Sequence, residues 1–105
     1  MDLLANFFTG AFLFNAIPHL AAGLQGARFQ TPFARPRGVG ESSALINVLW
    51  GTANLVIGLL LIARFPFSIG FTLGSLAAIA GALAIGSYLA VHFGNVRGAR
   101  DSGHP

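Results

Sequence analysis

Two histidines and a few asparagines, set in otherwise apolar stretches, are the side chains in this sequence that could do chemistry. Asn15 and His19 are four residues apart, which puts both on one face of a helix. His92 lies in a later apolar stretch, and together with His19 it could ligate a haem iron from two helices. The chain has no Cys, and its three acidic residues all lie outside the apolar stretches, so a metal site without haem and a base-activated nucleophile lack the residues they need. The residue types therefore favour a binding site over a catalytic one, with haem as one alternative cofactor.

Charged residues are too few for a soluble protein. They make up 9% of the 105 residues, against roughly a quarter in soluble domains, while hydrophobic residues make up 54%. A chain this small would leave much of its surface in water, which so few charges cannot cover. The net charge of +3 does not indicate nucleic acid as a partner, because the Arg residues form no continuous stripe and the aromatic residues lie in apolar runs. The composition excludes a soluble domain and a disordered chain, and it indicates a membrane protein.

The few charges divide the chain into three long uncharged stretches. These stretches contain 25, 22 and 32 residues, and a helix needs about 20 apolar residues to cross roughly 30 Å of hydrocarbon. Helices are expected because the backbone must satisfy its own hydrogen bonds in lipid. The sequence therefore predicts an all-α integral membrane protein with a single domain and three transmembrane helices, at about residues 3–24, 44–63 and 67–93.

The segments outside these helices also carry local signals. Pro32 and Pro36, with several glycines, argue against a helix in the long first loop, residues 25–43. Pro66 suits the first turn of the third helix, so we expect a very short second connection and an antiparallel hairpin of the second and third helices. The polar tail, residues 96–105, is expected to be mobile.

Arginine residues predict the orientation, because they concentrate on the cytoplasmic side of membrane proteins. Five of the six lie in the first loop and the tail: Arg28, Arg35, Arg37, Arg97 and Arg100. An N-out, C-in, multi-pass protein of the bacterial inner (cytoplasmic) membrane follows. The three loop arginines are expected to contact lipid headgroups, and the loop is either a lipid-facing connector or a lid or docking loop.

The third helix carries a regular series of small residues, here called the small-residue ridge. Its members occupy every fourth position: Gly70, Gly74, Ala78, Ala82, Gly86 and Ala90. Such a ridge lets two helices approach closely. The second helix has an Asn/Gly stripe of its own: Asn47, Gly51, Asn54 and Gly58. The simplest expectation is that the ridge packs on this stripe, and the alternative is that one of them faces another copy of the chain.

The predicted orientation gathers polar side chains at the cytoplasmic end of the bundle. Polar groups at membrane depth are costly, so they are candidates for function. The candidate ligand-binding or pathway residues are Asn15, His19, Asn47, Trp50, Asn54 and His92. Structural roles are open to them too: the asparagines can make interhelical hydrogen bonds, His19 can bond a neighbouring carbonyl, and Trp50 and His92 can lie at the membrane interface.

Three segments give the chain a family resemblance. They are Asn15-Ala-Ile-Pro-His19, the loop segment TPFARPRGVGESS at residues 31–43, and Asn47-Val-Leu-Trp-Gly-Thr-Ala-Asn54. In these segments the chain resembles small bacterial integral membrane proteins of uncharacterised function with three predicted spans, over residues 15 to about 60. The resemblance implies the three-span architecture, and it implies no activity, cofactor or catalytic residue.

Three functional hypotheses follow. The leading one is a non-enzymatic membrane protein that acts as an accessory subunit or homo-oligomer through the small-residue ridge, with membrane lipids and a larger membrane complex as partners. The second is an oligomeric transporter or channel with a polar pathway in its cytoplasmic half. The third is a module that binds haem, quinone or lipid, using His19 and His92 or the aromatic residues beneath the arginine-bearing loop.

Overall fold

Three helices make up nearly all of the computed structural model, which describes residues 2–37 and 39–102. Helix α1 is Leu3–Leu24, α2 is Ala44–Arg64 and α3 is Leu73–Ser102. Each contains a stretch long and apolar enough to cross a membrane, of 22, 21 and 27 residues respectively. The bounds of α1 and α2 agree with the predicted ones to within a residue.

Local hydrogen bonds and one glycine explain where α1 and α2 begin and end. The Asp2 carboxylate accepts a hydrogen bond from the Ala5 amide at 2.9 Å, and the Ser43 hydroxyl accepts one from the Ile46 amide at 3.3 Å. Both side chains satisfy amides that the first turn of a helix leaves unpaired. After α1, Gly26 adopts a φ of +74°, a left-handed conformation that glycine tolerates and that turns the chain out of the helix.

The start of α3 differs from the prediction. Pro66 lies in an eight-residue connection, residues 65–72, and not in the first turn of the third helix. Gly70 has a φ of +125°, which is incompatible with a helix, so the chain becomes helical only after it. The Thr72 hydroxyl then caps α3 by accepting a hydrogen bond from the Ser75 amide at 3.2 Å.

The end of α3 also differs from the prediction. The helix continues through Ser102, past residue 93 and into the segment expected to be a mobile tail. Polar residues and arginine are good enough helix formers to extend a helix beyond an apolar stretch, and no proline interrupts this one before residue 105. Residues 103–105 of the predicted tail lie outside the described residues.

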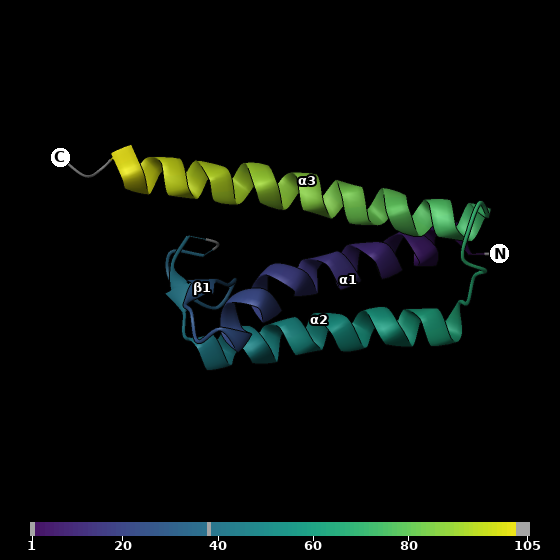
Figure 1. The fold of residues 1–105 in the computed structure, drawn as a ribbon, viewed down its shortest axis with the longest axis horizontal. Helices are drawn as coiled ribbons and strands as arrows, with labels where there is room; N and C mark the ends of the chain where they lie inside the picture. Colours follow the sequence, from purple (N-terminus) through teal and green to yellow (C-terminus); the bar gives the residue numbers. More distant parts are fainter. Residues whose placement is uncertain (1, 38, 103–105) are drawn as a thin grey trace.

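Helix α1 lies between α2 and α3 along most of the length of the bundle (Figure 1). Helices α2 and α3 make little direct contact within the described residues, so the predicted packing of the second helix on the third is wrong. The connection at residues 65–72 is long enough to carry α3 across to the other side of α1, which a four-residue turn would not allow.

Glycines permit the close approach of α1 to α3. A Cβ atom added to Gly10 would lie 1.8 Å from the carbonyl oxygen of Ala78, and one added to Gly81 would lie 1.8 Å from the carbonyl oxygen of Phe7. The backbones of α1 and α3 are therefore in direct contact at both glycines, of which one lies on each helix. Any larger side chain at either glycine must push the helices apart.

The small-residue ridge of α3 is used unevenly. Gly74 and Ala82 are buried, whereas Gly86 is half-buried and Ala90 is exposed. Gly70 lies outside α3, so the predicted GxxxG pair with Gly74 does not form on one helical face. The ridge packs on α1 along its first half and opens along its second half.

The Asn/Gly stripe of α2 also faces α1. A Cβ atom added to Gly51 would lie 2.7 Å from the Leu20 side chain, and one added to Gly58 would lie 2.5 Å from the Leu13 side chain. Both helices that flank α1 thus present their smallest residues to it. This explains why α1, and not α2 or α3, is the central helix.

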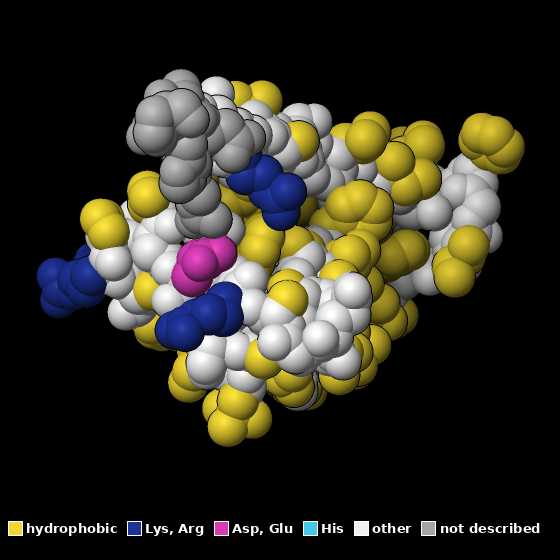
Figure 2. Space-filling view, turned by 60° about the vertical axis from the view of Figure 1, so that its left-hand side comes forward, with side chains coloured by type: hydrophobic (Ala, Val, Ile, Leu, Met, Phe, Trp, Pro, Cys, Tyr) yellow, Lys and Arg dark blue, Asp and Glu magenta, His cyan; other side chains and the backbone are white. Residues whose placement is uncertain are grey.

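Burial in this structure is inverted relative to a soluble protein. The fully or almost fully buried side chains include Asn6, Thr9, His19, Asn47 and Asn54, each at most 3% exposed. Many leucine, isoleucine and phenylalanine side chains face outward instead. Figure 2 shows hydrophobic side chains over most of the visible surface and the charged side chains near the end that carries the first loop. Such a distribution suits a lipid solvent, in agreement with three candidate membrane spans.

Candidate functional site

The first loop closes one end of the bundle through a short pair of strands. Strand β1 is Phe29–Gln30 and β2 is Glu41–Ser42, and they pair antiparallel with Phe29 opposite Ser42. The hydroxyls of Thr31 and Ser42 lie 2.5 Å apart beside this pair. The described residues of the loop, 25–37 and 39–43, form no helix, as the prolines and glycines predict. This end also carries the C-terminal part of α3, whereas Asp2 and the 65–72 connection lie at the opposite end (Figure 1).

Asn47 joins the loop to α1. Its amide nitrogen donates to the carbonyl oxygens of Phe29, Ser42 and Ser43, at 3.1, 3.2 and 3.0 Å. Its amide oxygen lies 2.9 Å from Nδ1 of His19. Because the nitrogen faces three acceptors, the oxygen must face His19, and Nδ1 of His19 must therefore be the donor.

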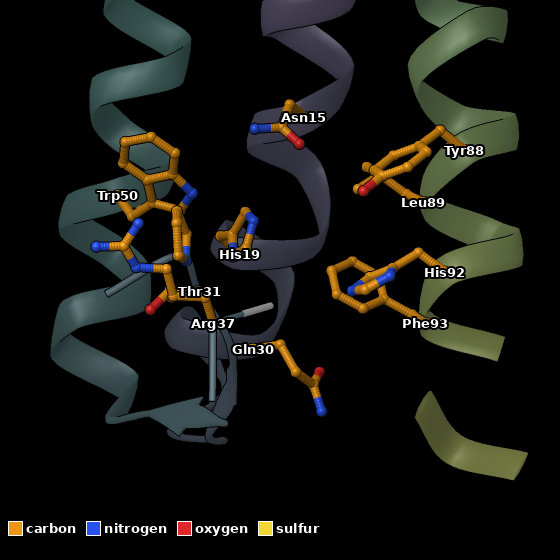
Figure 3. Close-up of a pocket in the computed structure, with 11 residues that line it drawn as sticks. Asn15, His19, Gln30, Thr31, Arg37, Trp50, Tyr88, Leu89, His92 and Phe93 are labelled. Atoms are coloured by element: carbon orange, nitrogen blue, oxygen red, sulfur yellow. The ribbon is translucent and has the colours of Figure 1, made fainter. Parts of the chain in front are cut away.

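A second asparagine pair lies one helical turn along α1. The Asn15 amide nitrogen donates to the amide oxygen of Asn54 at 2.9 Å, and the Asn54 nitrogen donates to the carbonyl oxygen of Trp50 at 2.9 Å. The predicted interhelical hydrogen bonds of the asparagines are therefore present, between α1 and α2. These bonds leave the amide oxygen of Asn15 directed away from α2, on the side of α3 (Figure 3).

A cavity of about 350 Å³, here called the His19 cavity, lies between α1, the first loop and the facing sides of α2 and α3. It is lined by Asn15, His19, Gln30, Thr31, Pro32, Arg37, Trp50, Tyr88, Leu89, His92 and Phe93. Figure 3 shows His19 at its centre, with Trp50 on one side and the α3 residues on the other. Three helices and the loop thus converge on one small space.

Aromatic rings line two sides of the His19 cavity. The His19 and Trp50 rings meet edge to face with centroids 6.4 Å apart. Trp50 is held from outside the cavity by Phe33, whose ring meets it in the same way at 5.0 Å. On α3, Tyr88 and His92 are stacked with centroids 5.7 Å apart. Flat aromatic walls of this kind accommodate a flat or ring-shaped ligand.

The second ring nitrogen of His19 opens onto this space. His19 is 3% exposed, and its Nδ1 is used by Asn47. Nε2 forms no hydrogen bond with a described residue. Every fully enclosed side-chain nitrogen or oxygen among those residues does have a hydrogen-bond partner, so Nε2 is not fully enclosed. The atom therefore reaches the His19 cavity, which its side chain lines.

The six predicted ligand-binding or pathway residues divide into two groups in the structure. Asn15, His19, Trp50 and His92 line the His19 cavity, whereas Asn47 and Asn54 lie behind it, 0% and 2% exposed. These last two use their polar atoms to hold α1 and the loop. Their position favours a supporting role over a pathway role.

The three predicted headgroup arginines also divide. Arg28, Arg35 and Arg37 are all exposed, and of these Arg37 lines the His19 cavity. The loop accordingly covers the cavity as well as connecting two helices.

Sequence reasoning missed several of the lining residues. Gln30 and Thr31 are buried at the cavity although they lie in a loop, and Tyr88 lines it one turn before His92. The four-residue spacing of Tyr88 and His92 was a usable signal, because it places both on one face of α3. Nothing in the loop sequence distinguishes Gln30 and Thr31, whose burial depends on the β1–β2 pairing.

An apolar groove of about 410 Å³ lies between α1 and α3 over the open half of the small-residue ridge. Gly86, Ala90 and Gly94 line it, together with Phe14 of α1 and Arg97. Leu89 and Phe93 line both this groove and the His19 cavity, so the two spaces share a wall.

Metal-binding clusters are absent from the part of the chain that the structure describes. Within residues 2–37 and 39–102 no three His, Asp or Glu side chains gather. His19 and His92 do line one cavity from α1 and α3.

Comparison with known proteins adds no assignment. No protein-family model, no curated protein and no solved structure matches this chain. Function must therefore be argued from the geometry of the site.

Proposed function

We propose that this protein is a non-enzymatic membrane protein that binds a small lipid-soluble ligand, with a ring at its polar end, in the His19 cavity. The observation that carries the proposal is Nε2 of His19, a polar atom of an almost fully buried side chain that opens onto this space. The volume of about 350 Å³ lies at the lower end of the range of roughly 300–1,000 Å³ for small-molecule sites.

The lining of the cavity supports a ligand that is partly apolar. Trp50, Tyr88, His92 and Phe93 supply aromatic surface, and a few polar groups lie among them. Small-molecule sites combine such a majority of apolar walls with a few placed polar atoms. The exposed apolar surfaces of the helices on either side would take an alkyl or isoprenoid tail in the bilayer.

We also propose that the His19 cavity opens near the cytoplasmic headgroups of a bacterial inner membrane, with the N-terminus outside. Arg28, Arg35, Arg37 and Arg97 lie at the loop end of the bundle, and Arg64 lies at the other. The positive-inside rule then favours the loop end as cytoplasmic. A lipid-soluble ligand would reach the cavity at the depth where its polar end meets the interface.

Haem is a second candidate ligand, favoured by the hydrogen bond between His19 and Asn47. A ligating histidine commonly donates its other ring N–H to a fixed acceptor, and here Nδ1 does so while Nε2 opens toward the cavity. His92 lines the same cavity from α3. A visible absorption spectrum of the purified protein separates this candidate from the proposed one, because a colourless preparation contains no haem.

The hypothesis of an accessory subunit or homo-oligomer stays a prediction, but it needs another surface. The first half of the small-residue ridge is occupied by α1 of the same chain. The open half, over Gly86 and Ala90, is the part of the ridge on which a second subunit would fit.

Trp50 gives the test of the proposed function, because it is the only tryptophan and it lines the His19 cavity. The purified protein in mild detergent is titrated with a decyl-substituted benzohydroquinone, and Trp50 fluorescence is followed. We expect saturable quenching, and we expect Leu89→Phe, which fills the cavity, to weaken it about tenfold, equivalent to about 1.4 kcal/mol.

Leu83→Phe is the matched control, since Leu83 is exposed on the same helix. It should leave the titration unchanged. Absence of saturable quenching in the unmodified protein, or equal quenching in both variants and the unmodified protein, would contradict binding in the His19 cavity.

A further inference from the structure

The hydrogen bonds behind the His19 cavity fix which of its polar atoms can accept. Asn47 is oriented by three carbonyl oxygens, so its amide oxygen takes the Nδ1 proton of His19. An uncharged imidazole with a proton on one nitrogen has a lone pair on the other. Nε2 of His19 is accordingly a hydrogen-bond acceptor where it opens onto the cavity.

Asn15 presents an acceptor in the same way. Its nitrogen donates to Asn54, and Asn54 is oriented by the bond from its own nitrogen to the Trp50 carbonyl. The Asn15 oxygen accepts no hydrogen bond from any described residue, and it lies on the α3 side of α1 (Figure 3). Two acceptors, one helical turn apart on α1, therefore line one cavity.

Acceptors on the wall require a ligand that donates. An ammonium group would donate, but Arg37 lines the cavity and no Asp or Glu is among its lining residues, so positive charge is disfavoured. A neutral hydroxyl group donates without that penalty. The aromatic walls formed by Trp50 and Phe93 suit a hydroxyl carried on a ring.

We propose that the His19 cavity selects hydroquinones and related phenols over the corresponding quinones. A ring hydroxyl donates to Nε2 of His19, the acceptor on an almost fully buried side chain of the cavity wall. A quinone has carbonyl oxygens only, which leave both α1 acceptors unpaired, and an unpaired buried polar group costs free energy. The inference rests on the proposed function and adds the chemical class of the ligand.

Three ligands with the same ring and tail test this inference on the unmodified protein. They are a decyl-substituted benzohydroquinone, its dimethyl ether and the parent quinone, each titrated in nanodiscs with Trp50 fluorescence as the readout and with free-tryptophan quenching subtracted. The hydroquinone should bind about tenfold more tightly than the other two, as expected when one buried hydrogen bond is lost.

Equal affinity for all three ligands would overturn the selection of donors while leaving binding in the His19 cavity intact. Tighter binding of the quinone would also overturn it. Failure of all three to give saturable quenching would overturn the proposed function together with the inference.

Variants then assign the acceptor. His19→Phe keeps an aromatic ring of similar size and should bring the hydroquinone to the affinity of its dimethyl ether. Thr52→Ala, at an exposed position on α2 that does not line the His19 cavity, should keep the preference. Far-ultraviolet circular dichroism of both variants checks that the helices remain, and a preference retained in a helical His19→Phe variant would refute the role of Nε2.

Discussion

Gly81→Ala should destabilise the bundle although alanine is the better helix former. A Cβ at this position would lie 1.8 Å from the carbonyl oxygen of Phe7 and 3.2 Å from the amide nitrogen of Ala11. The first distance falls short of ordinary van der Waals contact, which begins at 3.4 Å, by about 1.6 Å. The obstacle is backbone on both sides, so no flexible side chain can move away.

The expected magnitude follows from that displacement. A gap of 0.5–1 Å already forfeits about a quarter to a half of the dispersion energy of a contact, so separating α1 from α3 by about 1.6 Å removes most of it locally. Overpacking of this kind costs about 1–3 kcal/mol, and backbone against backbone belongs at the upper end. The gain of about 1 kcal/mol in helix propensity only partly offsets that cost.

Gly98→Ala is the matched control, because Gly98 lies on the same helix and a Cβ there would have nothing within 4 Å. It should leave stability unchanged or raise it by up to about 1 kcal/mol. Unfolding of both variants in mixed micelles with increasing sodium dodecyl sulfate, followed by circular dichroism, measures the difference. Equal midpoints for the two variants would refute the placement of α1 directly against α3.

Three further predictions test the loop anchor, the orientation and the assembly. Asn47→Leu should cost about 2–4 kcal/mol in the same unfolding assay, since it removes a bond to α1 and the bonds to the loop, whereas Thr52→Val on the exposed face of α2 should cost little; a cost equal to that of Thr52→Val would contradict the anchor. Because the chain has no cysteine, a single Ala34→Cys reports the side of the first loop, and an impermeant maleimide should label it in inverted but not in right-side-out vesicles. If the protein is a homo-oligomer, Ala90→Trp should lower its mass in mild detergent by filling the open half of the ridge, and a purely monomeric mass of the unmodified protein would end that hypothesis.

The number of helices could be predicted from the sequence because it depends only on where charges interrupt apolar stretches. The spacing of nine charged residues sets three segments long enough to span, and each supplies most of one helix of the structure. The start of α3 could not be predicted from Pro66 alone. It depends on the conformation of Gly70 and on the cap provided by Thr72. These two features delay the helix, whereas Pro66 by itself is compatible with a helix that begins earlier.

The central position of α1 could not be predicted either. The ridge of α3 and the stripe of α2 are both regular series of small residues in the sequence, which is why the sequence predicts that they pack on each other. The residues of α1 that receive them belong to no regular series: Gly10 meets Ala78 of the ridge, whereas Leu13 and Leu20 meet Gly58 and Gly51 of the stripe. A helix that packs against two neighbours through different faces shows no single stripe, which hides it from a search for periodicity.

The candidate site was more accessible to sequence reasoning than the packing, because polar residues in apolar helices are few. Asn15 and His19 share a face of α1 by spacing alone, and their partners on α2 had to be among the two asparagines available there. The direction of each hydrogen bond depends instead on the loop. Only the carbonyl oxygens of Phe29, Ser42 and Ser43 decide which way Asn47 faces, and these come together through the β1–β2 pairing.

The dependence of Asn47 on the loop couples stability to ligand choice. An apolar side chain at position 47 could fill the same space as Asn47. It could not hold the proton of His19 on Nδ1, and it could not bond the loop that covers the cavity. If the loop opened, Asn47 would lose the Phe29 carbonyl and keep that of Ser43, the N-cap of its own helix, so its orientation toward His19 would be held less firmly. The preference for hydroquinone over quinone should weaken with it. If the His19 cavity selects a donating ligand as proposed, a loop variant that weakens the β1–β2 pair should reduce both closure of the loop and that selection.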